Sequence, residues 1–421
     1  MKVNIHRLLT EAKDAVPQAE WIGLRRVTNH LTGFSAIDGK FDEAAGGSDE
    51  GVMLEVLYKG TFSYAATADL SSGGIKRAAE QAFAAAQAAQ PYGIHRFDQT
   101  MRPAAQVRYA TKREKLSGIP AAETVELLCS ICDAAKVSSK IIQTAASCET
   151  GICETEMVST NGADIRQTVR FGGISMNAVA REGDIIQQRS AHGRSALTYQ
   201  GGRELFNPAG LLEKARKAGA EAVELLTAEP CPNGKRTLVL MPDQMMLQIH
   251  ESVGHALEID RILGDERNYA GGSFITPEDI GSFRYGSPLM NVAFDPTIAQ
   301  ELASYGADDI GNAAVKEYLI KDGILIRALG SLESQKRSGL RGVANQRACS
   351  WNRPPIDRMA NLNLEAGTSS FDSIISSFSR FESLLIFASM LMAVSLLSDT
   401  SRYTSSTGLL FLVYLAPLPL L

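Results

Sequence analysis

Residues 248–258 read Gln-Ile-His-Glu-Ser-Val-Gly-His-Ala-Leu-Glu, and they hold two of the six histidines in this chain of 421 residues. His250 and His255 are five positions apart, and Glu251 follows the first histidine directly. Neutral imidazoles bind zinc, and a glutamate beside them that does not ligate the metal can take a proton from water. This stretch therefore contains the minimum set of side chains for hydrolysing a peptide bond.

The spacing of these histidines differs from the familiar zinc helix, His-Glu-x-x-His, which places both imidazoles on one face. On a straight α-helix, at about 100° per residue, the two imidazoles would lie roughly 140° apart. Both can reach one metal only if the helix widens locally, as in a π turn, or ends there. Gly254, just before the second histidine, makes such a distortion easier. We therefore expect an irregular helix between His250 and His255.

The composition is ordinary for a soluble protein of two or three domains, with 45% hydrophobic and 21% charged residues. The net charge of −5 and the absence of a dense Lys/Arg run argue against direct nucleic-acid binding. The first 26 residues lack the apolar segment of a secretory signal, and the six cysteines are irregularly spaced. We therefore expect reduced thiols and a cytoplasmic location.

Local patterns predict an α+β arrangement over the first half of the chain. An N-terminal α+β domain is predicted for residues 1–105 and a central α+β domain for residues 110–226. Asn161-Gly162 is a strong hairpin signal inside the central domain. Strands are predicted at 51–60, 61–68, 141–148, 153–159, 165–171, 175–181 and 184–190, and helices at 75–89, 121–137 and 208–226.

The second half of the chain has a different texture. Pro230-Cys231-Pro232-Asn233-Gly234 marks a boundary, and a strand at 236–241 leads into the histidine motif. Residues 257–367 are rich in Gly, Asp, Asn and Pro, which is typical of short strands and long functional loops. The predicted fold class is thus α+β, with an N-terminal α+β part followed by a β-rich catalytic domain, residues 230–370, that carries a metal-binding helix.

From about Trp21 to Ser370 the chain resembles the TldD/PmbA metallopeptidase family, also called modulators of DNA gyrase. The resemblance implies a cytoplasmic zinc peptidase that acts on unfolded or flexible peptides and assembles as a homodimer or as a heterodimer with a family member. It also implies that His250 and His255 bind zinc and that Glu251 is the catalytic acid and base. The matching stretches are 51–60, 230–232, 250–258, 260–261, 269–273, 344–348 and 350–359.

The sequence departs from the family near its end. The family's third zinc ligand is a cysteine close to the C-terminus, and no cysteine follows Cys349 here. We expect the resemblance to stop between about Ser370 and Arg380, and we interpret residues 381–421 as an aberrant apolar tail produced by a reading-frame change. The metallopeptidase domain would then be incomplete and its activity impaired. The apolar runs 384–397 and 409–421 are too short to span a bilayer, so membrane residence is not expected.

Two other functions stay open at this point. The missing cysteine favours a non-catalytic peptide-binding or partner subunit with a dead metal site, and the tail could also hold the protein at a membrane. Glu258 either orients an imidazole or is a surface residue of the helix. Cys129 and Cys132 have the spacing of half a metal site, but an apolar helical context favours buried structural thiols.

Three further features have two interpretations each. Cys349 is the nearest thiol that could replace the lost ligand, although nothing in the sequence supports the necessary geometry. A loop rich in Pro and Asn carries arginines that could grip a substrate or pin the loop internally to Asp357 and Glu365, and we favour the internal role. Gly271-Gly272 is either a flexible point that admits peptide or an ordinary turn. The loop arginines are Arg347, Arg353 and Arg358.

Overall fold

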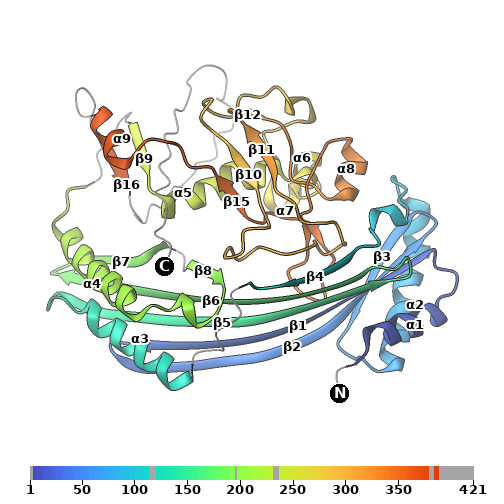
Figure 1. Cartoon of the computed structure of the whole chain (residues 1–421), viewed down its shortest axis with the longest axis horizontal. Helices are drawn as coiled ribbons and strands as arrows, with labels where there is room; N and C mark the ends of the chain where they lie inside the picture. The colour runs from blue at the N-terminus through green and yellow to red at the C-terminus, as the bar shows by residue number, and fades with distance from the viewer. Residues whose placement is uncertain (1–2, 113–119, 195–196, 231–236, 379–383, 388–421) are drawn as a thin grey trace.

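The computed structural model describes residues 3–112, 120–194, 197–230, 237–378 and 384–387. A long curved sheet built from the first half of the chain runs across the molecule (Figure 1). Four helices cover one face of this sheet, and the C-terminal half, which contains the histidine motif, lies over the other face. The predicted α+β fold class is confirmed.

The sheet has eight strands and joins both predicted N-terminal domains. Its order is β3-β2-β1-β5-β6-β4, and β7 and β8 also pair with β6. The β4–β6 pair is parallel, and the other pairs are antiparallel. The strands are β1 Trp21–Ile37, β2 Lys40–Tyr58, β3 Thr61–Thr67, β4 Gln106–Ala110, β5 Ile141–Ser159, β6 Asp164–Glu182, β7 Ile185–Arg194 and β8 Leu197–Gln200.

The strands between residues 141 and 182 are longer than predicted. The four short strands expected there are two continuous strands of 19 residues each, β5 and β6. Gly151, which falls between two of the predicted strands, lies inside the sheet. A Cβ atom there would come within 2.3 Å of the Phe171 ring and 2.9 Å of Leu31, so glycine is required by the aromatic ring that covers it. The hairpin at Asn161-Gly162 is confirmed, and Gly162 has a φ of 99°.

Two helix pairs bury the covered face of the sheet. Helices α1 (Ile5–Ala15) and α2 (Ser72–Ala89) pack over one half, and α3 (Ala121–Ala135) and α4 (Pro208–Glu224) pack over the other (Figure 1). The helices predicted at 75–89, 121–137 and 208–226 are therefore confirmed to within three residues at each end. Helix α1 and strand β1 have no counterpart in the sequence prediction.

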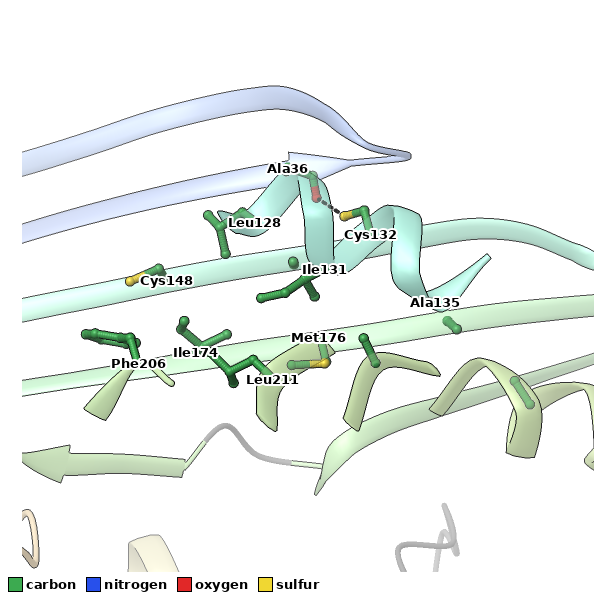
Figure 2. Packing of buried hydrophobic residues seen from close by; sticks show 14 of the residues in the cluster. Ala36, Leu128, Ile131, Cys132, Ala135, Cys148, Ile174, Met176, Phe206 and Leu211 are labelled. Atoms are coloured by element: carbon green, nitrogen blue, oxygen red, sulfur yellow. Dashed lines mark hydrogen bonds between the residues drawn. The ribbon is translucent and has the colours of Figure 1, made fainter. Parts of the chain in front are cut away.

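The Cys-x-x-Cys pair belongs to this core. Cys132 is 1% exposed, and its thiol donates to the carbonyl of Ala36, 3.4 Å away (Figure 2). Cys129 is half-buried, and burial raises the pKa of its thiol. Raised thiol pKa values disfavour the reactive thiolate, which supports the structural interpretation over a redox or metal role.

The C-terminal half holds short elements around a second core. Val292, Phe294, Leu319 and Leu257 are among its fully buried residues. The strands are β9 Thr237–Leu240, β10 Val292–Phe294, β11 Glu317–Lys321, β12 Ile324–Leu325, β13 Gln346–Arg347, β14 Ile356–Asp357, β15 Leu362–Leu364 and β16 Leu384–Phe387. The helices are α5 Pro242–Ile249, α6 Ile259–Leu263, α7 Arg267–Ala270, α8 Leu332–Ser338 and α9 Phe371–Phe378.

Strand pairing in this half is sparse. A four-stranded sheet has the order β12-β11-β10-β15, and β13 pairs with β14. Short 3₁₀ turns occur in both halves of the chain, at Gln90–Tyr92, Gln99–Met101, Arg203–Leu205, Leu225–Thr227, His255–Leu257 and Pro277–Asp279. Because its strands are short and few of them pair, the C-terminal half consists largely of loops, as the Gly- and Pro-rich sequence predicted.

Buried polar side chains join the two halves. Gln200 donates to the carbonyls of Leu302 and Ser304, and Gln167 donates to that of Ala307. Arg25 donates to the carbonyl of Arg353 at 2.8 Å. Because these side chains are buried and their partners are backbone groups, the C-terminal half is fixed on the sheet by directional bonds as well as by apolar contact.

Part of the predicted aberrant tail is described. Residues Leu384–Phe387 form β16, which pairs in parallel with β9, the strand that leads into α5. These four residues of the predicted aberrant tail therefore belong to a two-stranded sheet with β9. Residues 379–383 and 388–421 lie outside the described residues, as do residues 231–236 of the predicted boundary.

Candidate metal centre

The helix that carries the histidines changes its winding between them, as expected. Helix α5 ends at Ile249, and His250–Gly254 form a π turn in which the His255 N–H donates to the carbonyl of His250. A 3₁₀ turn follows at His255–Leu257. The two imidazole rings have centroids 4.7 Å apart and planes at 87°. The wide turn adds a residue to one turn, so both imidazoles come to the same side of the helix.

Gly254 serves this turn through its small size. Its φ of −56° and ψ of −66° are helical, so the conformational freedom of glycine that we expected to matter is not used. A Cβ atom at this position would instead lie 1.8 Å from Sδ of Met359 and 3.1 Å from Leu362. The turn therefore needs glycine because Met359 packs directly against the backbone.

His250, Glu251 and His255 form the candidate ligand cluster. One ligand atom from each can be chosen so that all three lie within 4.8 Å of one another, and within the described ranges these are the residues that meet this condition. The His250 Nε2 atom is 3.9 Å from Oε1 of Glu251. The side chains of His250 and Glu251 are 51% and 61% exposed, so the cluster opens toward solvent and a substrate could approach it.

The local electrostatics favour neutral imidazoles. Burial lowers the pKa of His250, and the neighbouring His255 lowers it further. Burial also lowers the pKa of His255, with a second contribution from the Arg261 guanidinium. Because a metal binds the unprotonated imidazole, these shifts keep both rings in the binding form near neutral pH. The residues present fit a divalent metal that accepts nitrogen and oxygen ligands.

Glu258 is a partner of His255 and not a surface residue. It is 5% exposed, and its Oε2 atom lies 2.9 Å from Nδ1 of His255. Arg261 completes the group, with its Nε 3.4 Å from Oε2 of Glu258. A neutral His255 that donates its Nδ1–H to Glu258 keeps the Nε2 lone pair free for a metal. Burial raises the pKa of Glu258 to about 7.

Sequence reasoning missed the acidic neighbours of this group. Burial and the nearby carboxylates of Asp357 and Glu258 raise the pKa of Asp260 to about 8. Burial raises the pKa of Asp357 as well, and Asp357 accepts the backbone N–H of Ser331 at 2.8 Å. Both residues lie in stretches that carry the family resemblance, but Asp357 is about a hundred residues from the histidine motif and no local signal links it to the site.

The other sequence candidates lie elsewhere or serve the structure. Cys349 is exposed in a loop that docks on the sheet, where Trp351 donates to Asp49 at 2.8 Å, and Cys349 is not part of the ligand cluster. Arg347 donates to the carbonyl of Met359 at 2.9 Å. Gly271 has a φ of 79°, which explains the glycine after α7 as a backbone requirement.

The expected internal pairing of the loop arginines takes a different form. The Glu365 carboxylate accepts from Lys316 at 2.8 Å and from the Tyr318 hydroxyl at 2.6 Å. Asp357 accepts from Ser331. Two of the three arginines, Arg353 and Arg358, make backbone hydrogen bonds that hold the loop, as Arg347 does with its side chain. The pairing with Asp357 and Glu365 is not found among the described residues, and a structural role of the side chain is supported for Arg347 alone.

A π turn that presents two histidines and a glutamate on an α+β scaffold suits a metallopeptidase, and comparison with known proteins shows this class. Three family models match in order: PmbA/TldA metallopeptidase domain 1 at residues 24–86, the central domain at 114–226 and the C-terminal domain at 233–412. The chain belongs to the TldD/PmbA family of metallopeptidases. The last match reaches residue 412, so our expectation that the resemblance stops between Ser370 and Arg380 is wrong.

Individual relatives agree with the family models. A metalloprotease of Methanothermobacter thermautotrophicus is 29% identical over 89% of this chain and 78% of its own length. A metalloprotease of Methanocaldococcus jannaschii is 27% identical over 80% of this chain and 72% of its own. A TldD homologue of Haemophilus influenzae is 32% identical over 39% of this chain and 32% of its own.

Solved structures show the same fold at low identity. A Thermotoga maritima protein described as a modulator of a DNA gyrase superposes with a TM-score of 0.69 at 15% identity, covering 89% of this chain and 80% of its own. TldE of Thermococcus kodakarensis gives a TM-score of 0.66 at 15% identity, covering 88% and 79%. Within the described residues, no helix combines the length and apolarity needed to cross a membrane.

Proposed function

We propose that this metallopeptidase uses zinc and cleaves unfolded or flexible peptides. The observation that supports this proposal is the π turn, which brings His250 and His255 to one side of the helix with Glu251 beside them. Two neutral imidazoles are zinc ligands in catalytic sites, and a carboxylate beside them that does not ligate the metal can serve as the general base. When bound, zinc would polarise the scissile carbonyl and lower the pKa of water in the site.

Glu251 carries the proton in this proposal. Its carboxylate is exposed beside the histidines, so it can take a proton from the attacking water and return it to the leaving amine. His255 is held in one orientation by Glu258, and His250 lies in the first position of the wide turn. The openness of the cluster suits an extended peptide, which we propose to bind along a strand edge through its main chain.

In this proposal the zinc has two protein ligands, His250 and His255, and lacks a third. The family resemblance implies a cysteine as third zinc ligand, and no cysteine follows Cys349 in the sequence. Catalytic zinc normally has three protein ligands, so we expect weakened zinc binding and impaired peptidase activity. The alternative function is that of a non-catalytic peptide-binding or partner subunit, which the same absence favours.

Assembly and location remain proposals that rest on the resemblance and the composition. We propose a homodimer, or a heterodimer with another family member, that acts in the cytoplasm without binding nucleic acid directly. Sedimentation of the purified protein, alone and with a related chain from the same source, tests the dimer. A monomer under both conditions would remove this part of the proposal.

The zinc assignment is tested by metal content. After purification without chelators, the protein should hold less than one zinc per chain, and His250→Ala should abolish what remains, because two ligands become one. Elemental analysis of both proteins measures this. Full occupancy that survives His250→Ala would place the metal elsewhere.

The role of Glu251 is tested separately in a chain to which a third ligand has been restored. Glu251→Gln keeps the size and hydrogen bonding of the side chain but cannot accept the proton. Hydrolysis of a flexible peptide should fall by about 10²–10⁴-fold while zinc content is unchanged. Retained activity would assign the base to another residue, and absence of activity in the restored chain itself would favour the non-catalytic alternative.

A further inference from the structure

Two hydroxyl groups from outside the metal helix hold the turn that carries the histidines. The Tyr285 hydroxyl donates to the backbone carbonyl of Ser252, which lies inside the π turn. The Ser273 hydroxyl donates to the carbonyl of Ala256 at 2.7 Å, one residue after His255. These two bonds lie on either side of His255, and both come from the segment between α7 and β10.

The hydrogen-bond donor to the Ser252 carbonyl differs between the wide turn and a straight helix. In a regular α-helix this carbonyl would accept from the amide of Ala256, four residues on. A π turn followed by a 3₁₀ turn shifts the pairing first to five residues and then to three, so carbonyls at the junction lose their regular amide. A buried carbonyl without a donor costs free energy, and a hydroxyl supplied from outside offsets this cost only in the wide form.

Tyr285 is itself firmly placed. Its backbone N–H donates to the carbonyl of Gly323 at 2.8 Å. Its ring meets the ring of Phe283 edge-on at 5.7 Å between centroids, and the ring of Phe274 lies 6.0 Å away. Burial raises the pKa of its hydroxyl far above the ordinary value of 10.0, so the group remains a donor. A rigid donor can impose a geometry on the turn, which a mobile one could not.

We propose that Tyr285, assisted by Ser273, is a positioning residue for the metal centre. By holding the carbonyls of Ser252 and Ala256, these hydroxyls keep the helix in its wide form and both imidazoles on one metal. Neither side chain touches the ligand atoms, so their effect is on the turn. This inference rests on the proposed metal site at His250 and His255.

The test compares two tyrosine-to-phenylalanine variants of the full chain. Tyr285→Phe removes the bond to Ser252, and Tyr318→Phe is the control, because Tyr318 also donates its hydroxyl in this half of the chain, to Glu365 at 2.6 Å. Zinc affinity is measured by competition with a coloured chelator, and the visible spectrum of added Co²⁺ reports ligand geometry. We expect Tyr285→Phe to weaken zinc binding about tenfold and to change the Co²⁺ spectrum, with Tyr318→Phe unchanged in both.

The outcomes separate this inference from the metal site itself. If the parent binds zinc through His250 and Tyr285→Phe matches it in affinity and spectrum, the positioning role is refuted while the site stands. If the parent binds no metal that depends on His250, both fail together. Should Tyr285→Phe not fold, as judged by circular dichroism, Ser273→Ala decides: weaker zinc binding supports the proposal, and parental affinity overturns it.

Discussion

At the scale of single residues, the environment of His255 explains how a short motif becomes a metal site. Oε2 of Glu258 and Nη2 of Arg261 both lie close to Nδ1 of His255, at 2.9 Å and 3.2 Å. Burial of Glu258 makes its carboxylate a stronger partner for a metal-bound imidazole than an exposed one would be, because the local dielectric is low. A His255 that donates Nδ1–H to Glu258, three positions further along the chain, has the tautomer that metal binding requires.

Replacing Glu258 should therefore weaken metal binding without removing a ligand. Glu258→Gln keeps an acceptor for His255 but loses the charge that raises the basicity of the ring. We expect zinc affinity to fall about tenfold, the lower end of the range for such partners. Glu266→Gln is the matched control, because Glu266 pairs with Arg261 at 3.1 Å but contacts neither histidine. Equal affinities of the two variants in a chelator competition would contradict the orienting role.

The buried carboxyl of Asp260 should make stability depend on pH. Its pKa is raised from 3.8 to about 8, chiefly by burial, so between these values the folded chain binds more protons than the unfolded chain. The stabilisation is complete below about pH 4 and is lost as the pH rises through 8. In metal-free protein, Asp260→Asn should raise the melting temperature relative to the parent by about 2–4 °C per kcal/mol at pH 8.5, with the difference shrinking as the pH falls and disappearing below about pH 4. A pH-independent difference in melting temperature would contradict this assignment.

At the scale of secondary-structure elements, the metal helix shows how packing fixes an irregular turn. The π turn is covered by Met359 and Leu362 on the side of Gly254 and is hydrogen-bonded by Tyr285 at Ser252. The wide turn is thus specified by contacts from two separate segments as well as by its own sequence. The same logic applies to the long strands, where Phe171 covers Gly151 and keeps β5 continuous.

Adding one methyl group to this turn should be costly. Gly254→Ala would place a Cβ atom 1.8 Å from Sδ of Met359, so the side chain or the turn must move. We expect a loss of about 1–3 kcal/mol in the free energy of unfolding. Because the added Cβ conflicts with Sδ of Met359, Met359→Ala should remove part of that cost. A double-mutant cycle of the two substitutions, followed by unfolding in urea, measures their coupling. Strictly additive costs would show that the turn accommodates alanine by another route.

At the scale of the whole molecule, a buried ion-pair network fastens the C-terminal half to the sheet. Arg102 is 2% exposed, and its Nε atom donates to Glu55 of β2 at 2.9 Å. Its Nη2 atom lies 2.5 Å from Oε1 of Glu333 in α8, and its guanidinium lies 4.1 Å over the ring of Phe62. The Arg102 side chain thus links β2 of the first half with α8 of the second half.

Removing this arginine should destabilise the fold far more than removing an exposed one. Arg102→Ala would leave two carboxylates near each other in a buried site, and we expect a loss of about 3–5 kcal/mol. Arg77→Ala is the control, since Arg77 and its partner Asp69 are 66% and 47% exposed, and its loss should cost about 0–1 kcal/mol. Denaturant unfolding compares the two, and similar costs would mean that the network contributes no more than a surface pair.

The sequence by itself determined the features that depend on neighbours along the chain. The helices at 75–89, 121–137 and 208–226 follow from short-range periodicity, and the hairpin at Asn161-Gly162 follows from the φ that glycine permits. The irregular helix was predictable because His250 and His255 cannot otherwise share a metal, and the α+β fold class followed from the local strand and helix patterns together with the family resemblance.

Tertiary structure alone decided what depends on residues far apart. Whether a glycine interrupts a strand or lies beneath a ring depends on the neighbouring strand, and Gly151 lies beneath Phe171 of β6. The partner of Arg102 in α8 is 231 positions away, and the burial that raises the pKa of Asp260 comes from packing around it. Burial and the distance between charges depend on the three-dimensional fold, which local sequence patterns do not encode. The grouping of Glu258, Asp260 and Asp357 near His255 therefore became evident only from the structure.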